Sequence, residues 1–460
     1  MLSDSNIQRI LEAGLEKNAD FAEVFIEEKK TSGVSLLNDE VLSAKSDIDF
    51  GFGIRLMSGV NYIYVYSNET DADKLIAMTR EASCALKSGD PARIKEISDR
   101  SRSSASLITR DPLKVTKKEY IGYLEKAIER ALSFDPLITQ VSASLGTSNR
   151  KVRIINSDGF NREEDNTRTR FFINVIATKG NEKQTSSVSP GTMKGYEFVE
   201  NYPITSKIDE CCEGAIRMIN AGYAPSGKMP VVLGNGFGGV IFHEACGHAL
   251  EATSVGIKAS YFTDMLGKQI ASPIVNAYDD ARIEGEWGSY MTDDEGNTSS
   301  SLLLIENGIL KNYLIDKLGS RRMGMPATGC GRRQNYTYAP TSRMSNTFIA
   351  AGSDRPEDIV ADTEYGLYCT KMGGGSVNTS TGDFNFAVNE AFMIRNGKIC
   401  EPVRGATLIG KGGDILKDID KVGNDLQLSA GVCGSMSGNI PVTVGQPTIR
   451  VSSMLVGGRD

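Results

Sequence analysis

The hydrophobic positions of the first ninety residues change period twice. Residues 5–17 carry one apolar helical face, whereas residues 21–67 alternate apolar and polar positions between glycine and asparagine turn signals. A second apolar face over residues 70–88 predicts a helix that packs on the resulting sheet. We therefore expect a helix, an antiparallel meander and a second helix, which together form an α+β unit over residues 1–90.

The same change of period recurs farther along the chain. Residues 89–115 are polar and small in their middle part and predict a linker or loop, and residues 117–133 predict a helix. Alternating segments then predict strands at 138–145, 151–156, 168–178 and 184–188. A helix over 205–221 closes this region. The pattern indicates a second α+β unit over residues 112–222.

The last half of the chain shows few helical patterns and many short strand patterns. Glycine, proline and serine mark a boundary at 222–229, and beyond residue 255 helical periodicity is scarce among short strands and glycine turns. Residues 228–460 are therefore predicted to form one large, mainly antiparallel β domain. The fold class that follows is α+β, with mixed or antiparallel sheets in the first two units.

Composition narrows the class of protein. The 460 residues hold 40% hydrophobic and 24% charged residues, which is ordinary for a globular chain, and the net charge of −7 argues against a nucleic-acid partner. The longest nearly apolar run, Val231 to Phe242, is too short for a membrane span, and the first residues do not resemble a signal peptide. Eight cysteines without framework spacing predict reduced thiols, so we expect a cytoplasmic protein without a membrane partner.

The chain contains only two histidines, and they lie five residues apart. His243 and His248 flank Glu244 in the segment IFHEACGHALEA. Two imidazoles beside a carboxylate are a donor set typical of zinc sites, although isolated histidines are more often hydrogen-bonded core or surface residues. Because these are the only two histidines and a glutamate adjoins the first, we favour a metal site.

The spacing of the two histidines needs a local distortion. A straight α-helix separates residues i and i+5 by about 140°, so both rings would not reach one ion. A π-bulge would return them to one face, and Gly247 lies where the backbone must adjust. The same glycine also fits close packing against a neighbouring strand.

The third ligand of such a site has to be something other than histidine. A catalytic zinc usually has three protein ligands and one open position. The residues alone leave several candidates, namely Cys433, Cys246, Cys330, Glu251 or an aspartate of the last unit. The remaining cysteines are expected to be small apolar residues.

A glycine-rich stretch precedes the histidines. Gly234, Gly236 and Gly239 match G-x-G-x-x-G between a strand and a helix, which alone would suggest a dinucleotide site. Residues 251–271 do not supply the expected second strand with an acidic end, so NAD is disfavoured. We expect these glycines to turn the chain and deliver His243 near the start of a helix.

Several segments together resemble a known family. HEACGHALEA, GRRQNYTYAPTSRMSNTFIAAG, YGLYCTKMGGGSVNTSTGDFNFAVNEAF and GVCGSMSGNIPVTVGQPTIRVSSMLVGG are similar to the TldD metallopeptidases of the TldD/PmbA superfamily. This resemblance covers nearly the whole chain. It implies an HExxxH zinc site with His243, His248 and, as third ligand, Cys433, and it sets the chain apart from the PmbA (TldE) branch, which lacks these residues. Cys246 inside the motif departs from the family pattern.

The resemblance also implies a function and a partner. Members of the family are cytoplasmic peptidases that act on unfolded or small modified peptides, and a TldD subunit pairs with a TldE/PmbA subunit or forms a homodimer. Their C-terminal β domain has the shape of an open barrel, which agrees with the pattern of residues 228–460. One Zn²⁺ would be bound per active subunit, with Glu244 as the general base that takes the proton of water.

Some roles stay open at this level. Candidates for steadying an oxyanion are Tyr336, Arg332, Arg333 and Asn335, all of which also fit structural roles. The stretch Gly373-Gly374-Gly375 would either pair with an extended peptide or form a bare turn. Two other functions compete with the peptidase, namely a non-catalytic peptide-binding subunit and a zinc amidohydrolase of small amides.

Overall fold

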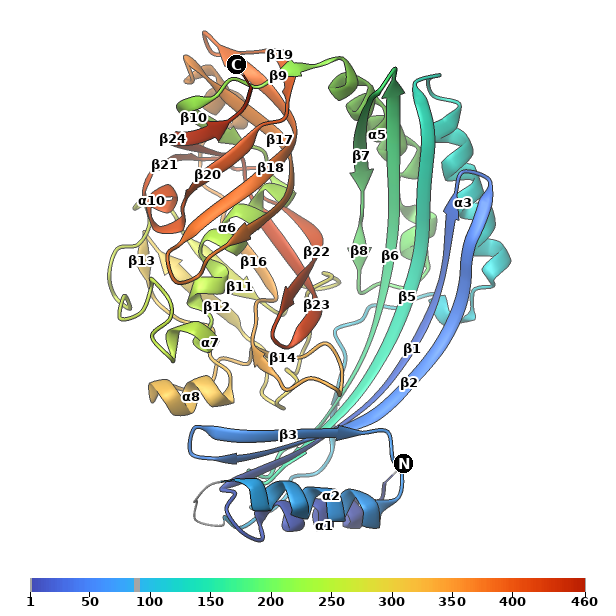
Figure 1. Cartoon of the computed structure of the whole chain (residues 1–460), viewed down its shortest axis with the longest axis vertical. Coiled ribbons are helices and arrows are strands. Elements are labelled where there is room, and N and C mark those ends of the chain that lie inside the picture. The colour runs from blue at the N-terminus through green and yellow to red at the C-terminus, as the bar shows by residue number, and fades with distance from the viewer. Residues whose placement is uncertain (1, 87–91, 460) are drawn as a thin grey trace.

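Two parts of the molecule face each other in the computed structural model, which describes residues 2–86 and 92–459. A long curved sheet, built from the first half of the chain, arches beside a β-rich C-terminal region (Figure 1). The α+β fold and the mainly β character of the last region are therefore confirmed. The predicted end of a helix at residue 88 and the predicted boundary at residue 90 lie outside the described residues.

The curved sheet joins the first two predicted units. Its strands are β1 (Phe21–Leu37), β2 (Glu40–Ser58), β3 (Asn61–Ser67), β4 (Ser101–Ser103), β5 (Ile138–Asn156), β6 (Asn161–Lys179), β7 (Glu182–Val188) and β8 (Gly191–Thr192). They follow the order β3-β2-β1-β5-β6-β4, and β7 and β8 also pair with β6. β1 and β5 pair from Glu23↔Asn156 to Leu37↔Ser142, so one sheet runs through both units. The division at residues 112, 222 and 228 stays a prediction.

The strands are longer and the linker more ordered than the sequence indicates. The segments predicted at 138–145 and 151–156 are one continuous strand, β5, because residues 146–150 pair with β1 on one side and with β6 on the other, although their burial does not alternate. β4 lies inside the segment predicted as a linker and pairs parallel with β6. The polar side chains of β4 do not indicate a strand by themselves, since its pairing with β6 supplies the stability.

Helices cover the two ends of the curved sheet. They are α1 (Asp4–Leu15), α2 (Ala72–Ala85), the 3₁₀ turn η1 (Pro112–Lys114), α3 (Lys117–Leu132), α4 (Glu197–Asn201) and α5 (Ile204–Asn220). α1 and α2 lie side by side at one end, and α3 and α5 cover the outer face at the other (Figure 1). Their apolar faces form two cores, one with β1 and β2 and one with β5 and β6.

A closed ring of strands forms one layer of the C-terminal region. Its sheet contains β9 (Gly222–Tyr223), β10 (Gly227–Leu233), β17 (Tyr365–Val377), β18 (Asp383–Arg395), β19 (Lys398–Arg404), β20 (Thr407–Lys411), β21 (Ile419–Val422) and β24 (Ile449–Gly457). The order β17-β10-β24-β20-β18 closes because β17 also pairs with β18. The barrel-like shell predicted as open is thus a closed barrel in this structure.

A second sheet lies beside this barrel. It follows the order β13-β12-β11-β16-β23-β22, and a short pair is formed by β14 and β15. The bounds are β11 (Ala277–Asp280), β12 (Ser301–Glu306), β13 (Ile309–Leu310), β14 (Gly331–Arg332), β15 (Thr341–Ser342), β16 (Asn346–Ile349), β22 (Gln427–Ser435) and β23 (Gly438–Gln446). The C-terminal region also contains the short helices α7 (Ala252–Val255), α8 (Lys317–Met323), α9 (Pro356–Ala361) and α10 (Gly412–Lys417).

The segment with the histidines lies between the two C-terminal sheets. Helix α6 (Val240–Ala245) contacts β17 and β18 on one side and β16 and β23 on the other. Its apolar residues belong to the largest core, which also contains barrel residues such as Leu367 and Val451. Because both sheets bury this helix, its polar side chains have fixed surroundings.

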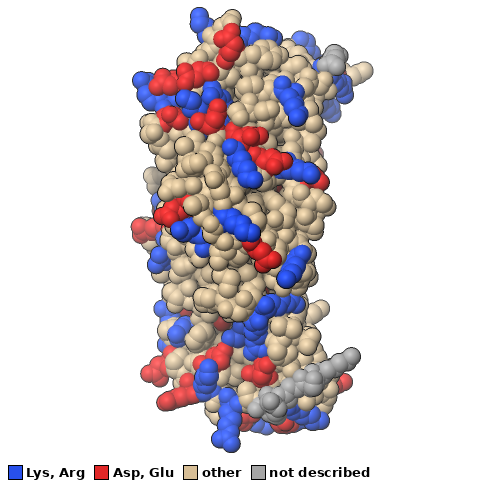
Figure 2. Space-filling model, turned by 90° about the vertical axis from the view of Figure 1, so that its left-hand side faces the viewer, with Lys and Arg blue, Asp and Glu red and all other residues tan. Residues whose placement is uncertain are grey.

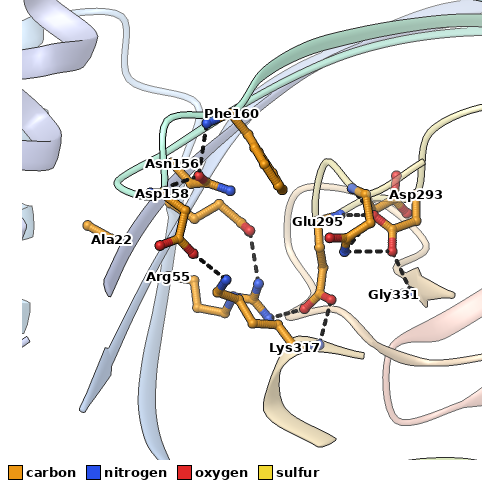
Figure 3. A network of polar contacts seen from close by, with 12 residues as sticks. Ala22, Arg55, Asn156, Asp158, Phe160, Asp293, Glu295, Lys317 and Gly331 are labelled. Carbon is orange, nitrogen blue, oxygen red and sulfur yellow. Dashed lines mark hydrogen bonds and ion pairs between the residues drawn. The ribbon is translucent and has the colours of Figure 1, made fainter. Parts of the chain in front are cut away.

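Buried charges join the curved sheet to the C-terminal region. Glu23 and Arg55 from the sheet form an ion pair of 2.9 Å, and Arg55 also forms an ion pair with Glu295 at 2.6 Å. Glu23 accepts a second bond from Arg333 at 2.7 Å. Figure 3 shows Arg55 and Glu295 in this network, with Lys317 close by. Since all four of the paired side chains are at most 5% exposed, we call them the interface network.

On the face drawn in Figure 2 and in the described helices, the surface charges and the helix lengths show no sign of a specialised surface or of a membrane-spanning helix. Basic and acidic side chains are interspersed over the face drawn in Figure 2, without a patch of one sign. In the described part of the chain, no helix combines the length and the apolar character that crossing a bilayer requires.

Candidate metal centre

The two histidines are brought to one side by a break in the helix. A 3₁₀ turn, η2 (Gly236–Gly239), leads into α6, which carries His243 and Glu244. The chain leaves helical geometry at Cys246 with φ −131° and ψ −53°, and His248 follows in the 3₁₀ turn η3 (Gly247–Leu250). The expected π-bulge is therefore wrong: a change from α to 3₁₀ geometry reorients the second imidazole instead.

Two glycines make this path sterically feasible. A Cβ atom on Gly247 would overlap with Sδ of Met344, so close packing applies here together with the backbone change. A Cβ atom on Gly239 would overlap with the backbone of Gly445 in β23. The glycine-rich stretch thus packs against a neighbouring strand directly before α6, as expected for a segment that positions His243.

Three side chains from distant parts of the sequence converge. Nε2 of His243 lies 3.3 Å from Sγ of Cys433, and Nε2 of His248 lies 3.2 Å from the same sulfur. The three potential ligand atoms all lie within 4.8 Å of one another. The two rings are nearly perpendicular, at 85°, with centroids 5.0 Å apart. We call His243, His248 and Cys433 the His-His-Cys cluster.

The cluster fits the requirements of a tetrahedral metal ion. Bonds of about 2.3 Å to sulfur and 2.0–2.1 Å to nitrogen place tetrahedral ligand atoms roughly 3.5 Å apart. The two sulfur–nitrogen distances, 3.3 and 3.2 Å, are close to this spacing. Because both histidines use the same nitrogen and all three side chains are buried, the donor set suits a soft or borderline divalent ion.

The two histidines favour the ionised form of the Cys433 thiol. Burial alone would raise the pKa of the Cys433 thiol, but His243 and His248 outweigh it and lower this pKa to about 4. Burial likewise opposes the charged form of His248, yet Glu251 and Cys433 raise its pKa well above the ordinary value. The thiolate form of Cys433, the form that ligates metals, is therefore favoured.

Two glutamates occupy different positions around His248. The Glu244 carboxylate lies 3.8 Å from Nε2 of His248, on the side of the ring that faces the cluster, and is 22% exposed. The Glu251 carboxylate lies 3.2 Å from Nδ1, on the opposite side of the ring. Glu251 was one of the candidate ligands, but its position is that of a partner that orients the imidazole.

A buried arginine, Arg343, supports the backbone of the strand that carries Cys433. The sequence alone does not predict this role. Arg343 donates to the backbone oxygen of Cys433 at 2.6 Å and to the oxygen of Gly438 at 2.9 Å, across the hairpin of β22 and β23. Its Nε lies 3.9 Å from Glu251. An arginine with no exposed surface that bonds backbone oxygens leaves no local sequence signal, since its partners are far away in the chain.

The other cysteines proposed as ligands lie elsewhere. Cys246 is buried in the apolar core, and this burial raises the pKa of its thiol. Cys330 is also in that core, and its sulfur accepts a hydrogen bond from Thr328 at 3.4 Å. Neither belongs to the group of His, Cys, Asp and Glu residues that converge among the described residues.

The residues suggested for an oxyanion lie at the contact with the curved sheet. Arg332 donates to the backbone oxygens of Met344 and Pro441, and Arg333 belongs to the interface network. The backbone nitrogen of Tyr336 donates to Glu27 of β1, and Asn335 accepts from Thr337. These contacts are structural, and none of them reaches the His-His-Cys cluster.

The three glycines at 373–375 form neither a loop nor a bare turn. They lie within β17, where the pairing with β18 shifts register between Met372 and Gly375. Pairing of this strand with an extended peptide stays a prediction.

Comparison with known families agrees with a metallopeptidase. The model of the PmbA/TldA metallopeptidase C-terminal domain matches residues 226–458, the model of the central domain matches 110–219, and that of domain 1 matches 22–83. A fold with this cluster in the C-terminal region is thus that of a metal-dependent hydrolase. The chain belongs to the PmbA/TldD family and is a metallopeptidase of the TldD type.

Curated relatives cover the full length of the chain. It is 32% identical to the metalloprotease TldD homolog of Buchnera aphidicola, over 99% of this chain and 96% of the relative. It is 33% identical to that of Haemophilus influenzae, over 100% and 97%. The fold also matches the crystal structure of TldE from Thermococcus kodakarensis, with a TM-score of 0.79 and 17% identity over 98% of this chain and 100% of that one.

Proposed function

We propose that this protein is a zinc-dependent peptidase in which His243, His248 and Cys433 hold the metal and Glu244 moves the proton. The observation that carries the proposal is the convergence of both imidazole Nε2 atoms on the Cys433 sulfur, with the Glu244 carboxylate 3.8 Å from His248. A bound zinc ion would supply Lewis-acid chemistry, which polarises the scissile carbonyl and makes water more acidic.

Each residue of the site then has a defined task. The Glu244 carboxylate accepts a proton from the attacking water and delivers it to the nitrogen of the leaving amine. Its partial exposure lets it meet a substrate, whereas the three cluster residues are buried. Glu251 fixes the ring of His248 through Nδ1, so that Nε2 stays directed at the cluster.

The substrates are proposed to be unfolded peptides or small modified peptides in the cytoplasm, with a TldE/PmbA-type subunit as partner. A fold shared with a TldE protein and the match of this chain to PmbA/TldA family models support such a pairing. A homodimer is the alternative assembly. Size-exclusion chromatography of the chain with and without a co-expressed TldE-type subunit separates the two.

The central test replaces Glu244 by Gln. We expect the purified variant to keep its metal, measured by elemental analysis, and to cleave an unfolded peptide roughly a thousandfold more slowly. Glu213→Gln, at an exposed position of α5, is the matched control and should leave cleavage unchanged. Retained cleavage in Glu244→Gln contradicts the assigned role.

Two further assays address the competing functions. A zinc-loaded chain that binds peptides but does not cleave them, with or without its partner, would be a peptide-binding subunit. Faster turnover of small acyl amides than of unfolded peptides would instead indicate an amidohydrolase.

A further inference from the structure

A cavity of about 240 Å³ lies between the curved sheet and the hairpin of β22 and β23. Val432, which directly precedes Cys433, lines it, and so do Asn439 and Pro441 of the paired strand. Side chains alternate along a strand, so Val432 faces this cavity while Cys433 faces the histidines. The cavity and the His-His-Cys cluster therefore lie on opposite faces of one hairpin.

Basic side chains of three adjacent strands point into the cavity. Lys29 of β1 lies directly opposite Arg150 of β5, and Arg168 of β6 lines the same cavity. Like charges at directly opposed positions destabilise a sheet unless something compensates them. Arg150 is compensated by Glu27 at 2.5 Å and Asp294 at 2.8 Å.

Lys29 and Arg168 have no such compensation. Among the described residues, no carboxylate lies within ion-pair distance of either side chain, although Arg168 is only 8% exposed. Arg168 donates through Nε and Nη2 to the backbone oxygens of Trp287 and Ser289, and its Nη1 has no acceptor in the part of the chain that the structure describes. Burial and the nearby Arg332 lower the pKa of Arg168 to about 9.

The acidic residues that line the cavity are already engaged. Asp294 accepts from Arg150 and from the backbone nitrogen of Arg333. Glu164 accepts from Asn166 and from the backbone nitrogens of Met291 and Thr292, among other donors. Asp293 accepts from Asn297 and the backbone nitrogens of Glu295 and Gly331. The carboxylates that line the cavity are thus already hydrogen-bonded, and Lys29 and Arg168 contribute further donors and positive charge.

Part of the cavity wall is apolar, namely Val152, Trp287, Val432, Ile440 and Pro441. Trp287 lines this cavity and also a neighbouring groove of about 460 Å³ that runs along the curved sheet. Its Nε1 donates to the backbone oxygen of Gly431, two residues before Cys433. A cationic end beside an indole ring suits a carboxylate that is attached to an organic chain better than it suits a bare inorganic ion.

We propose that this cavity binds the carboxylate of a peptide, through Lys29 and Arg168, outside the metal cluster. The assignment of the ligand as a peptide rests on the proposed function. The carboxylate comes either from the C-terminus of the peptide or from an acidic side chain. A ligand held here touches the face of the hairpin opposite the Cys433 side chain, so the site is an accessory site of the peptidase.

Trp287 makes the proposal directly measurable, because it is the single tryptophan of the chain. Glu244→Gln protein, which holds peptides without rapid turnover, is titrated with acetylated tri-alanine and with its C-terminal amide, and the indole fluorescence is followed. A second pair, acetyl-Ala-Glu-Ala-amide and acetyl-Ala-Gln-Ala-amide, tests the side-chain carboxylate. We expect the acid of at least one pair to bind about tenfold more tightly than its neutral partner.

The same titrations with Lys29→Gln provide the specific test. This substitution removes a side chain without an ion pair, and it should bring the two members of the preferred pair to within about twofold. Lys30→Gln is the matched control, since Lys30 is the next residue and pairs with half-buried Glu28 at 2.9 Å. It should keep the preference.

Two results overturn the proposal: equal binding within both peptide pairs, or a preference that survives Lys29→Gln. A preference in a chain that shows no peptide cleavage would keep the carboxylate site and refute the peptidase. Cleavage without any preference would keep the peptidase and refute the site.

Discussion

Two buried polar clusters of this molecule differ in how their charges are balanced. In the interface network, Glu23 lies between Arg55 and Arg333, and Arg55 lies between Glu23 and Glu295. In the His-His-Cys cluster, the Cys433 sulfur faces two imidazole nitrogens and has no lysine or arginine partner among the described residues. The charges of the interface network are paired within the chain, and the His-His-Cys cluster is a donor set for a cation.

The difference shows how a buried charge can be recognised as structural or as a binding site. Desolvation makes every buried charge costly, so a structural charge needs an internal partner. Arg343 illustrates the distinction within one site, because it bonds backbone oxygens around Cys433 and leaves the thiol to the cluster. A buried ionisable group without a charged partner in the chain therefore points to a ligand.

The largest expected effect comes from removing the thiolate. Cys433→Ser should weaken zinc binding on the order of a thousandfold, because serine replaces a ligand that is ionised by its surroundings with a neutral hydroxyl. Competition with a chromophoric chelator measures the affinity. The matched control is Cys246→Ala, which changes a buried cysteine of the same motif that lies outside the cluster. Equal affinity in both variants would contradict the assignment of Cys433.

Breaking the interface network should cost stability and leave the metal in place. Glu23→Gln removes the carboxylate between two buried guanidinium groups, and we expect a loss of about 3–5 kcal/mol in the free energy of unfolding. Urea denaturation of the metal-loaded chain measures this loss. Asp73→Asn breaks the exposed pair with Arg9 and should cause no measurable change. Loss of zinc from Glu23→Gln under native conditions would contradict the distinction between a structural interface network and a separate metal site.

A smaller effect is expected when the support of the cluster is changed. Arg343→Lys keeps the charge but loses several hydrogen bonds to the hairpin, so zinc affinity should fall about tenfold. Arg332→Lys is matched, since Arg332 also bonds backbone oxygens in the core but not those of Cys433 or Gly438. If both variants lose the same stability and only Arg343→Lys loses affinity, Arg343 is a positioning residue. Unchanged affinity in Arg343→Lys would leave it a purely structural role.

The smallest effect concerns pH. Burial would raise the pKa of Glu23, but Arg55 and Arg333 outweigh it and lower this pKa below 4.5. The native state then binds fewer protons than the unfolded state, so the stability from Glu23 is present above this value and is lost as pH falls through the lowered pKa. The stability difference between wild type and Glu23→Gln should shrink on acidification below about pH 4.5. A difference that is constant from pH 6 to pH 3 would contradict this origin.

Much of the fold follows from local patterns. Alternation of apolar and polar residues over 21–67 predicts the meander, because successive side chains of a strand point to opposite faces. In the structure burial alternates only near the end of β1, whereas residues 21–27 and 51–58 are buried on both faces. Helix α3 (Lys117–Leu132) agrees closely with the predicted 117–133, since a capping box at Thr116 marks its start. In contrast, the pairing of β1 with β5 joins residues more than a hundred positions apart, and no local period indicates it.

The residues of the candidate site likewise fall into those that the sequence predicts and those that only the structure reveals. The sequence by itself determined that His243, Glu244 and His248 stand together and that a third ligand could not be histidine. Family resemblance, not spacing, singled out Cys433. Only the tertiary structure placed Glu251 behind His248, Arg343 behind Cys433, and Lys29 beside Arg168 in one cavity.

Sequence patterns report on neighbours along the chain, whereas the site depends on contacts between residues that are far apart in the sequence. Periodicity reports which face of an element is buried, and a short motif reports neighbours along one turn of the chain. Ligation, ion pairing and cavity lining depend on side chains that approach across sheets, from residues separated here by 185 positions or more in the case of Cys433 and the histidines. Their energies depend on distance and burial, and these exist only once the two sheets of the C-terminal region and the curved sheet have packed together.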